Sequence, residues 1–430
     1  MSESPIWHPF TQHAVFPDSI FIDRAEGAYL YDRDGRPILD AISSWWVNIH
    51  GHNHPRIVAA VQAQAARLDQ VIFAGFTHAP AEALAEKLIA LAKAAHMPDL
   101  TRVFFSDSGS TSVEVALKMA LGYWTHKGKP RKGIVALEHA YHGDTFGTMS
   151  VGGRSVFNAA YEALLFDVHR LPYPSDSGAQ TIEAFETLLK AQDDDIAALI
   201  VEPLVLGAAG MLMYPPQVLK DLHALCRRHG ILFIADEVMT GWGRTGTRFA
   251  CEQAGVAPDI ICLSKGMTGG FLPLAVTLAS EDIYRAFYSP DRAKTFFHSS
   301  SFTGNPMACA AACAALDLWD EEPVLQRIAA IQAHQAAIAR RLAKRDDVAN
   351  VRHMGTILAL DVKGEHGYLA DVAVKLYRYF LTQGMLLRPM GDTVYVLPPY
   401  CVTTQDLDKI ADTIERGLDA LGNGGLECAS

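Results

Sequence analysis

Apolar runs alternate with amphipathic stretches from about residue 56 to residue 320, which is typical of an α/β layered fold. Short apolar runs bounded by glycine, proline or charged residues predict buried strands, and apolar residues three and four apart predict helices. The predicted strands are 102–106, 133–137, 196–201, 230–235 and 259–264. The predicted helices are 57–68, 81–91, 110–124 and 218–228. This order of elements favours a mostly parallel sheet covered by helices.

The last hundred or so residues follow a different pattern. An alanine-rich stretch after Pro323 predicts a long helix that ends near residue 344. Short strands are predicted at 350–353, 357–362 and 394–397, with a helix at 372–383 between them. This pattern predicts a smaller α+β unit.

Composition narrows the possible functions of the 430-residue chain. Half of the residues are hydrophobic and 20% are charged, as in globular proteins. The formal net charge of −11 argues against a nucleic acid or an anionic membrane as partner. The first 20 residues contain no apolar core of a signal peptide, and the longest apolar stretch, 197–216, is interrupted by Glu202 and Pro203. With seven cysteines and no C-x-x-C motif, we expect a reducing, cytoplasmic location.

Two side chains at neighbouring strand ends carry the strongest chemical signal. The strand at 230–235 is followed by Asp236, and the strand at 259–264 is followed by Lys265. A parallel sheet presents its ligand site at the carboxyl ends of its strands. One amine and one acid at that edge are the pair that pyridoxal phosphate needs: a lysine for its aldehyde and a carboxylate for its ring nitrogen. Taken alone, each residue is more often an exposed lysine or a turn-forming aspartate.

A possible phosphate site follows the strand at 102–106. In the segment Asp107–Thr111, Gly109 permits a tight turn, and the helix that begins at Ser110 offers free amides to an anion. The alternative is that Ser108 or Ser110 only caps the helix. Neither G-x-G-x-x-G nor G-x-x-x-x-G-K occurs here, so the segment does not indicate a dinucleotide site or a P-loop.

Other residues have a functional and a structural interpretation. Tyr141 and His142 follow the strand at 133–137 and could stack on a flat ring, or only pack a loop. Trp45 and Trp46 should point to opposite sides of a strand, one into the core and the other into a pocket. The histidines of segment 50–55 lack metal-site spacing, so we expect no metal.

The motifs together resemble those of class III pyridoxal phosphate aminotransferases. The similarity rests on segment 232–246, which reads LFIADEVMTGWGRTG, and on its continuation through Ser264-Lys265-Gly266 to Gly269-Gly270. It extends from about residue 7 to about residue 420. The resemblance implies a dimer of the aspartate-aminotransferase type, fold type I, with the active site at the subunit interface. It also implies three parts: residues 1–55 as an N-terminal segment of the small domain, 56–320 as the large cofactor-binding domain, and 321–430 as the rest of the small domain.

The resemblance assigns roles to residues of this chain. Lys265 would anchor pyridoxal phosphate and carry the proton, Asp236 would pair with the ring nitrogen, and Tyr141 would stack on the ring. Gly109 and Ser110 would hold the phosphate, and Ser300 and Ser301 would add contacts from the other subunit. Arg388 would pair with a substrate carboxylate; by default it would form a surface ion pair. The remaining substrate positions are Phe10, Trp45, Trp46, Ser299 and Tyr395, with Tyr141 and Lys265 also in contact.

Further segments resemble those of one branch of the family. They include the segments 6–10 (IWHPF), 43–46 (SSWW), 77–80 (THAP), 141–146 (YHGDTF) and 397–400 (LPPY). This branch transaminates 8-amino-7-oxononanoate in biotin biosynthesis, and S-adenosylmethionine is its usual amino donor. Phe10 stands where the branch usually has tyrosine, and Ser299-Ser300-Ser301 replaces Gly-Pro-Thr.

Three other functions remain open from the sequence alone. The chain could be a class III aminotransferase with an ω-amino acid, diamine or lysine donor. It could be an aminomutase, which needs no separate acceptor, or a protein that binds the cofactor without catalysis.

Overall fold

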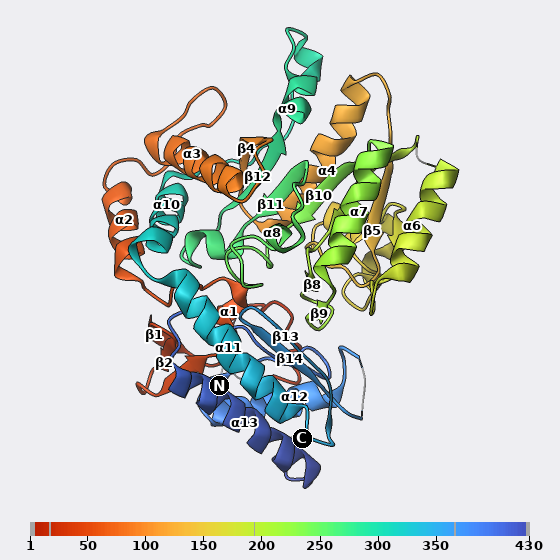
Figure 1. Cartoon of the computed structure of the whole chain (residues 1–430). Coiled ribbons are helices and arrows are strands. Elements are labelled where there is room, and N and C mark those ends of the chain that lie inside the picture. The colour runs from red at the N-terminus through yellow and green to blue at the C-terminus, as the bar shows by residue number, and fades with distance from the viewer. Residues whose placement is uncertain (1–4, 17–18, 193, 365–366, 427–430) are drawn as a thin grey trace.

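The computed structural model describes residues 5–16, 19–192, 194–364 and 367–426. Its largest sheet has the strand order β4-β12-β11-β10-β7-β5-β6 (Figure 1). The strands are β4 (Leu100–Ser106), β5 (Gly133–Leu137), β6 (His169–Leu171), β7 (Ile196–Val201), β10 (Leu232–Asp236), β11 (Ile260–Leu263) and β12 (Ala275–Ser280). β12 runs antiparallel to β4 and β11, and the other neighbouring strands pair in parallel. The predicted mixed, mostly parallel sheet is therefore confirmed.

Helices cover both faces of this sheet, so its strands are apolar on both sides. In β10, Ile234 packs toward α4 (Gly109–His126), whereas Phe233 faces the cluster that contains α7 (Pro216–His229). Each fully buried side chain of this size contributes roughly 1.5–3 kcal/mol to folding. The other helices of this region are α2 (Pro55–Ala65), α3 (Ala79–Ala94), α5 (Phe146–Val151), η1 (Ala159–Leu164), α6 (Ala179–Gln192), α8 (Cys251–Ala254), η2 (Lys265–Thr268), α9 (Glu281–Phe287), η3 (Arg292–Lys294) and α10 (Pro306–Glu321). A small antiparallel pair, β8 (Val205–Leu206) and β9 (Leu212–Met213), follows β7.

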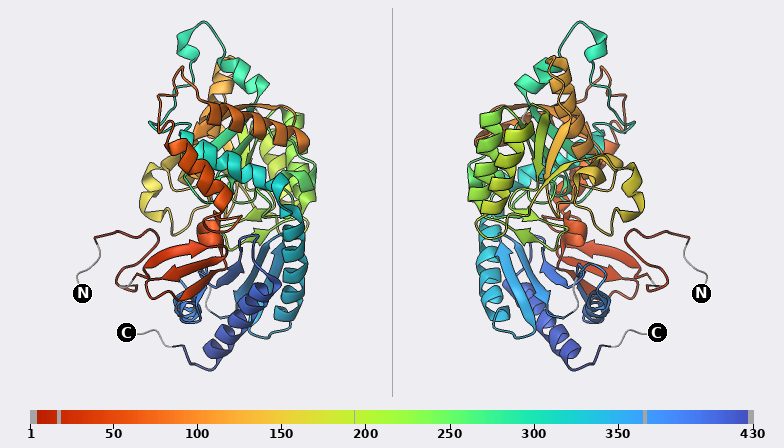
Figure 2. Two further views of the ribbon diagram at one scale, coloured as in Figure 1. Left: turned by 90° about the vertical axis from the view of Figure 1, so that its left-hand side faces the viewer. Right: turned by 90° about the vertical axis from the view of Figure 1, so that its right-hand side faces the viewer.

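Strands near the N-terminus and the elements after α10 pack together in a smaller α+β unit (Figure 2). The N-terminal strands β1 (Ile22–Glu26), β2 (Tyr29–Asp32) and β3 (Pro37–Asp40) form a sheet with β15 (Met385–Leu386), which pairs with β3 in parallel. A second sheet consists of β13 (Val348–Met354), β14 (Ile357–Val362) and β16 (Thr393–Val396). The helices here are α11 (Val324–Leu342), α12 (Asp371–Thr382) and α13 (Thr404–Gly422). The domain boundaries at 55 and 320 stay a prediction.

One predicted element was wrong. The segment with Trp45 and Trp46 is not a strand but the short element α1 (Ser43–Trp46), within which Ser44 and Trp45 have non-helical torsion angles. Ser43, Ser44 and Trp46 have positive φ angles, which an extended strand does not accommodate. The two indoles nevertheless separate as expected: Trp46 is 6% exposed and Trp45 is 43% exposed.

Within the described ranges, no helix is long and apolar enough to cross a membrane, and no three histidine, cysteine or acidic side chains are grouped to hold a metal. In segment 50–55, His52 contacts Asp40 and His54 contacts Glu322.

Candidate active site

The carboxyl ends of β7, β10 and β11 carry the candidate residues. β10 ends at Asp236, and β11 pairs with it in parallel, with Cys262 opposite Asp236. Lys265 follows β11 and begins η2. Since parallel strands end at one edge of the sheet, the predicted acid and amine lie at the same edge.

The amine of Lys265 lies in an apolar and aromatic environment. Its Nζ atom is 4.4 Å from the centre of the Trp46 ring. Burial lowers the pKa of Lys265 to about 8, although the negative charges of Asp236 and Glu202 oppose this shift. The residue has a φ angle of 45°, which a lysine adopts only when its surroundings impose it. At neutral pH, a much larger fraction of this amine is therefore neutral and nucleophilic than of an exposed lysine.

Asp236 is held by a buried histidine. One carboxylate oxygen of Asp236 lies 2.7 Å from His142 Nδ1, and the other accepts a hydrogen bond of 3.1 Å from the Val238 N–H group. Burial alone would lower the pKa of His142, but the hydrogen bond to Asp236 and its charge outweigh this and raise the pKa. Asp236 is 4% exposed, so water screens its charge only weakly and its interactions with nearby groups are strong.

A second buried acid, Glu202, follows β7 directly. Its oxygens accept hydrogen bonds from the N–H groups of Tyr141 and Gly207, each of 2.9 Å. Burial raises the pKa of Glu202 to about 7, and the nearby charge of His142 opposes that rise. This carboxyl therefore fixes the backbone of Tyr141 and adds to the charge around Lys265.

The predicted anion site lies at the N-terminus of α4, and its role stays a prediction. Ser108 is its N-cap and forms a capping box with Thr111, so Ser110 is free of that role. Within the described part of the chain, the amides of Gly109 and Ser110 have no protein acceptor. A Cβ atom at position 109 would lie 2.7 Å from Val238 Cγ1, so glycine is required for this close approach.

The serine segment lies beside this anion site in the same chain. The Ser300 hydroxyl donates to Asp107, which follows β4 and precedes the N-cap Ser108. The carbonyl of Ser301 accepts a hydrogen bond of 3.0 Å from Gln70, and the Ser299 hydroxyl lies 3.4 Å from that of Thr303. The predicted contribution of Ser300 and Ser301 to a second subunit stays a prediction.

The paired tryptophans reach two different parts of the site. Trp46 donates a hydrogen bond of 3.0 Å from its Nε1 atom to the hydroxyl of the buried Tyr395 and lies against Lys265. Trp45 faces the Arg388 guanidinium, whose carbon is 5.4 Å from the indole centre. The two adjacent tryptophans of one turn thus contact Lys265 and Arg388, one each.

Aromatic side chains continue this wall away from Trp45. Phe10 makes edge contacts with Trp45 at 5.5 Å and with Phe157 at 5.7 Å, measured between ring centres. Phe157 in turn contacts Tyr141 at 6.3 Å and Tyr368 at 4.5 Å. Such a wall suits a long, mainly apolar substrate chain.

Arg388 lies at the end of this wall rather than in a surface ion pair. Its Nη2 atom donates a hydrogen bond of 2.6 Å to the carbonyl of Phe10. Within the described residues no carboxylate lies within ion-pair distance of it. A cavity of about 360 Å³ lies next to Tyr141 and His142, and it is also lined by residues 152–158, 208–210, Leu212, Met390, Asp392 and Thr393.

Residues 11–418 match the family model of class III aminotransferases. The chain is a class III aminotransferase. It is 49% identical to a protein of Synechococcus elongatus named adenosylmethionine-8-amino-7-oxononanoate aminotransferase, over 98% of this chain and 100% of the relative. A Geobacter sulfurreducens protein of the same name is 38% identical over 97% of this chain and 96% of its own length.

Solved structures agree with the fold of this aminotransferase. The adenosylmethionine-8-amino-7-oxononanoate aminotransferase of Methanocaldococcus jannaschii aligns with a TM-score of 0.92 and 32% identity, over 96% of this chain and 97% of that one. An amine transaminase from an uncultivated Pseudomonas species, in its PLP-bound form, aligns with a TM-score of 0.91 and 34% identity, over 97% and 99%.

Sequence reasoning missed several residues of the candidate site. Glu202 follows a predicted strand, so the strand-end rule that found Asp236 could have found it. His142 was predicted only to stack on a ring or pack a loop, and its contact with Asp236 joins residues far apart in sequence. Phe157 and Tyr368 lie in loops, where no local pattern indicated a role.

Proposed function

We propose that this aminotransferase converts 8-amino-7-oxononanoate to 7,8-diaminononanoate in biotin biosynthesis. Pyridoxal phosphate is its cofactor, and S-adenosylmethionine is the proposed amino donor. The observation that carries the proposal is the shared sheet edge of Lys265 and Asp236, beside a helix N-terminus and an aromatic wall that ends in Arg388. The names of relatives that align over nearly the full length of the chain support this choice of substrate.

The site residues fit three polar groups of pyridoxal phosphate: its phosphate, its aldehyde and its ring nitrogen. The free amides at Gly109 and Ser110 suit the phosphate, since helix N-termini bind anions. The partly neutral amine of Lys265 suits the aldehyde. Asp236, backed by His142, suits a protonated ring nitrogen. When bound, the cofactor accepts the electrons of a C–H bond that breaks next to an amine, and it carries the amino group between two substrates.

Residues of this chain then move the proton, hold the ring nitrogen and position Tyr141. Lys265 moves the proton at its Nζ atom, because burial brings its pKa close to neutrality. Asp236 keeps its negative charge toward the ring nitrogen, and His142 holds that carboxylate in place. Tyr141 is positioned by the bond from its N–H group to Glu202.

The aromatic wall and Arg388 orient the substrate. A planar guanidinium matches a carboxylate well, so Arg388 would bind the acid end of the oxo acid. Trp45 and Phe10 would pack along its methylene chain, while Trp46 and Tyr395 border the reacting end near Lys265. Ser299 completes the proposed substrate contacts.

The donor is tested by incubating the enzyme and 8-amino-7-oxononanoate with S-adenosylmethionine, lysine or an ω-amino acid, one at a time. Mass spectrometry of 7,8-diaminononanoate is the measurement. We expect product with S-adenosylmethionine. Product with lysine alone would replace the proposed donor, and Phe10→Tyr would then show whether the missing hydroxyl changes the choice. Amine turnover without any product would favour the function named in the Pseudomonas amine transaminase.

We also propose that the enzyme acts in the cytoplasm as a homodimer. Large apolar side chains near the serine segment are exposed in one chain: Ile72 is 64%, Phe76 61%, Phe297 71% and Phe302 62% exposed. Exposed apolar groups of this size indicate a protein contact. A second subunit placed there would bring Ser300 and Ser301 to its partner's site.

The pKa of Lys265 leads to a prediction on amine reactivity. In protein freed of bound aldehydes, Lys265 should react with an amine-selective reagent with a midpoint near pH 8, whereas free lysine titrates near 10.4. The reason is that burial favours the neutral amine. Peptide mass spectrometry across pH measures the labelling. A midpoint at the pH of free lysine would contradict the proposed environment.

A further inference from the structure

The turn that carries Trp45 and Trp46 has an unfavourable backbone. Ser43, Ser44 and Trp46 have φ angles of 52°, 59° and 67°, and none of them is glycine. Residues with a side chain rarely adopt this region, and such a turn persists only when its surroundings hold it. Both indoles lie in the proposed site, so the groups that hold the turn also place the site walls.

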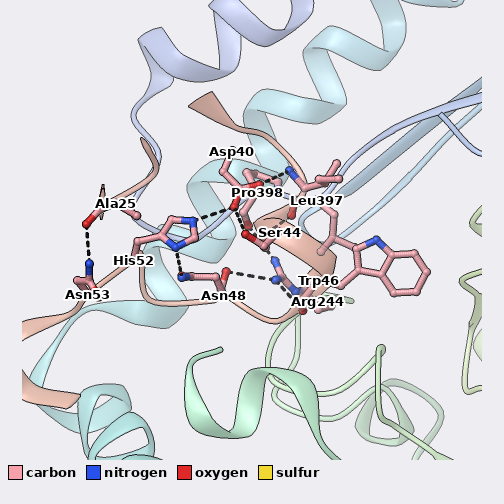
Figure 3. Close-up of polar contacts among 12 residues, drawn as sticks. Ala25, Asp40, Ser44, Trp46, Asn48, His52, Asn53, Arg244, Leu397 and Pro398 are labelled. Atoms are coloured by element: carbon pink, nitrogen blue, oxygen red, sulfur yellow. Dashed lines mark hydrogen bonds and ion pairs between the residues drawn. The ribbon is translucent and has the colours of Figure 1, made fainter. Parts of the chain in front are cut away.

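A buried carboxylate holds one side of the turn (Figure 3). Asp40 is fully buried, and its Oδ2 atom accepts a hydrogen bond of 2.9 Å from the Ser44 hydroxyl. The same oxygen lies 2.9 Å from His52 Nε2, and His52 Nδ1 lies 3.0 Å from the Asn48 side-chain nitrogen. Asn48 follows the turn, so this chain of contacts ties both of its ends to one carboxylate.

A buried guanidinium holds the other side of the Ser43–Trp46 turn. Arg244 is 1% exposed and donates to the carbonyl groups of Trp46 at 3.2 Å, Asn48 at 3.5 Å and Pro398 at 2.8 Å. In Figure 3 the Trp46 indole points away from these contacts, so Arg244 binds the Trp46 backbone, while the indole ring contacts Tyr395 and Lys265. The Ser43 hydroxyl adds a bond of 2.8 Å to the carbonyl of Leu397.

We propose that Asp40, His52 and Arg244 are positioning residues that clamp the Ser43–Trp46 turn in its strained form. The clamp keeps Trp46 against Lys265 and Trp45 against Arg388. It therefore sets the distance between the reacting end and the carboxylate end of the substrate pocket. This inference rests on the proposed function, because it assigns the two indoles to the substrate pocket.

The test is Asp40→Asn in the cofactor-loaded enzyme, which keeps the size of the side chain but removes the charge that accepts from Ser44 and His52. We expect kcat/KM for 8-amino-7-oxononanoate to fall about 10- to 100-fold, mainly through KM, since small displacements of positioning groups have such effects. Bound cofactor should remain at its wild-type level. Near-ultraviolet circular dichroism should change, and that change should vanish when Trp45 and Trp46 are both phenylalanine.

A matched control separates positioning from general stability. His54 and Glu322 form a similar contact, 3.0 Å between His54 Nε2 and Glu322 Oε1, outside the site. Glu322→Gln should leave the circular dichroism of Trp45 and Trp46 and the KM unchanged. If Asp40→Asn does not fold, Ser44→Ala removes a single bond of the clamp and should give the same pattern more weakly.

The two proposals fail in different ways. Unchanged dichroism and a KM within about twofold of wild type in Asp40→Asn and Ser44→Ala would overturn the clamp. An equal loss in Glu322→Gln would overturn it too. If the wild-type enzyme does not turn over 8-amino-7-oxononanoate, the substrate proposal fails, while the dichroism of Trp45 and Trp46 still decides the clamp.

Discussion

Replacing Lys265 with alanine should lower the rate of transamination by about four orders of magnitude or more, because one amine both anchors the cofactor and moves the proton. The covalent link between protein and pyridoxal phosphate should disappear under denaturing mass spectrometry. The cofactor should still bind under native conditions, since the amides at Gly109 and Ser110 and the pair Asp236–His142 are untouched. Stopped-flow and steady-state assays of product measure the loss.

Two further variants test whether the loss of activity is specific to the nucleophilic amine of Lys265. Lys265→Arg keeps a cation near Trp46 but forms no link to an aldehyde, so it should be as inactive as the alanine variant. Lys129→Ala removes an exposed lysine and should behave as wild type. Turnover retained by Lys265→Arg would show that charge, and not the nucleophilic amine, is the property that the site requires.

The placement of Asp236 and Lys265 was predictable from sequence because it follows a rule of sheet topology. Two apolar runs bounded by turn residues indicate buried parallel strands, and the residues just after such strands lie at a common edge of the sheet. The structure confirms β10 and β11 as parallel neighbours, with Asp236 and Lys265 at the ends of these two strands. The helix at 109–126 was equally predictable, from a serine N-cap followed by an apolar stripe.

The surroundings of that chemistry depend on contacts between distant residues. His142 supports Asp236 across 94 positions of sequence, and no local pattern indicates such a pair. The segment Ser43–Trp46 was predicted to be a strand, but it forms a turn. Its torsion angles depend on contacts with Asp40 and Arg244, and Arg244 lies far away in sequence. Tertiary contacts override local preference in such segments, and those segments gather at functional sites.

Asp236→Asn should reduce kcat/KM by about 10²–10³-fold, the usual cost of removing a preorganised charge next to a reacting group. Asparagine has the same shape but cannot balance a protonated ring nitrogen. The pKa of His142 should fall in this variant, because the hydrogen bond and charge that raise it are weakened while its burial remains. Proton NMR of the His142 ring across pH measures that change independently of activity.

The neighbouring Glu237 provides the matched control, since it too is fully buried but faces away from this chemistry. Its carboxyl accepts hydrogen bonds from the N–H groups of Ala250 and Cys251 and from the Thr240 hydroxyl. Glu237→Gln should therefore lower the melting temperature and leave the titration of His142 as in wild type. An Asp236→Asn enzyme that lost only stability, with kcat/KM and the His142 pKa unchanged, would reduce Asp236 to the same structural role. The contrast between two adjacent carboxyls thus separates a charge that acts on the cofactor from one that only holds the fold.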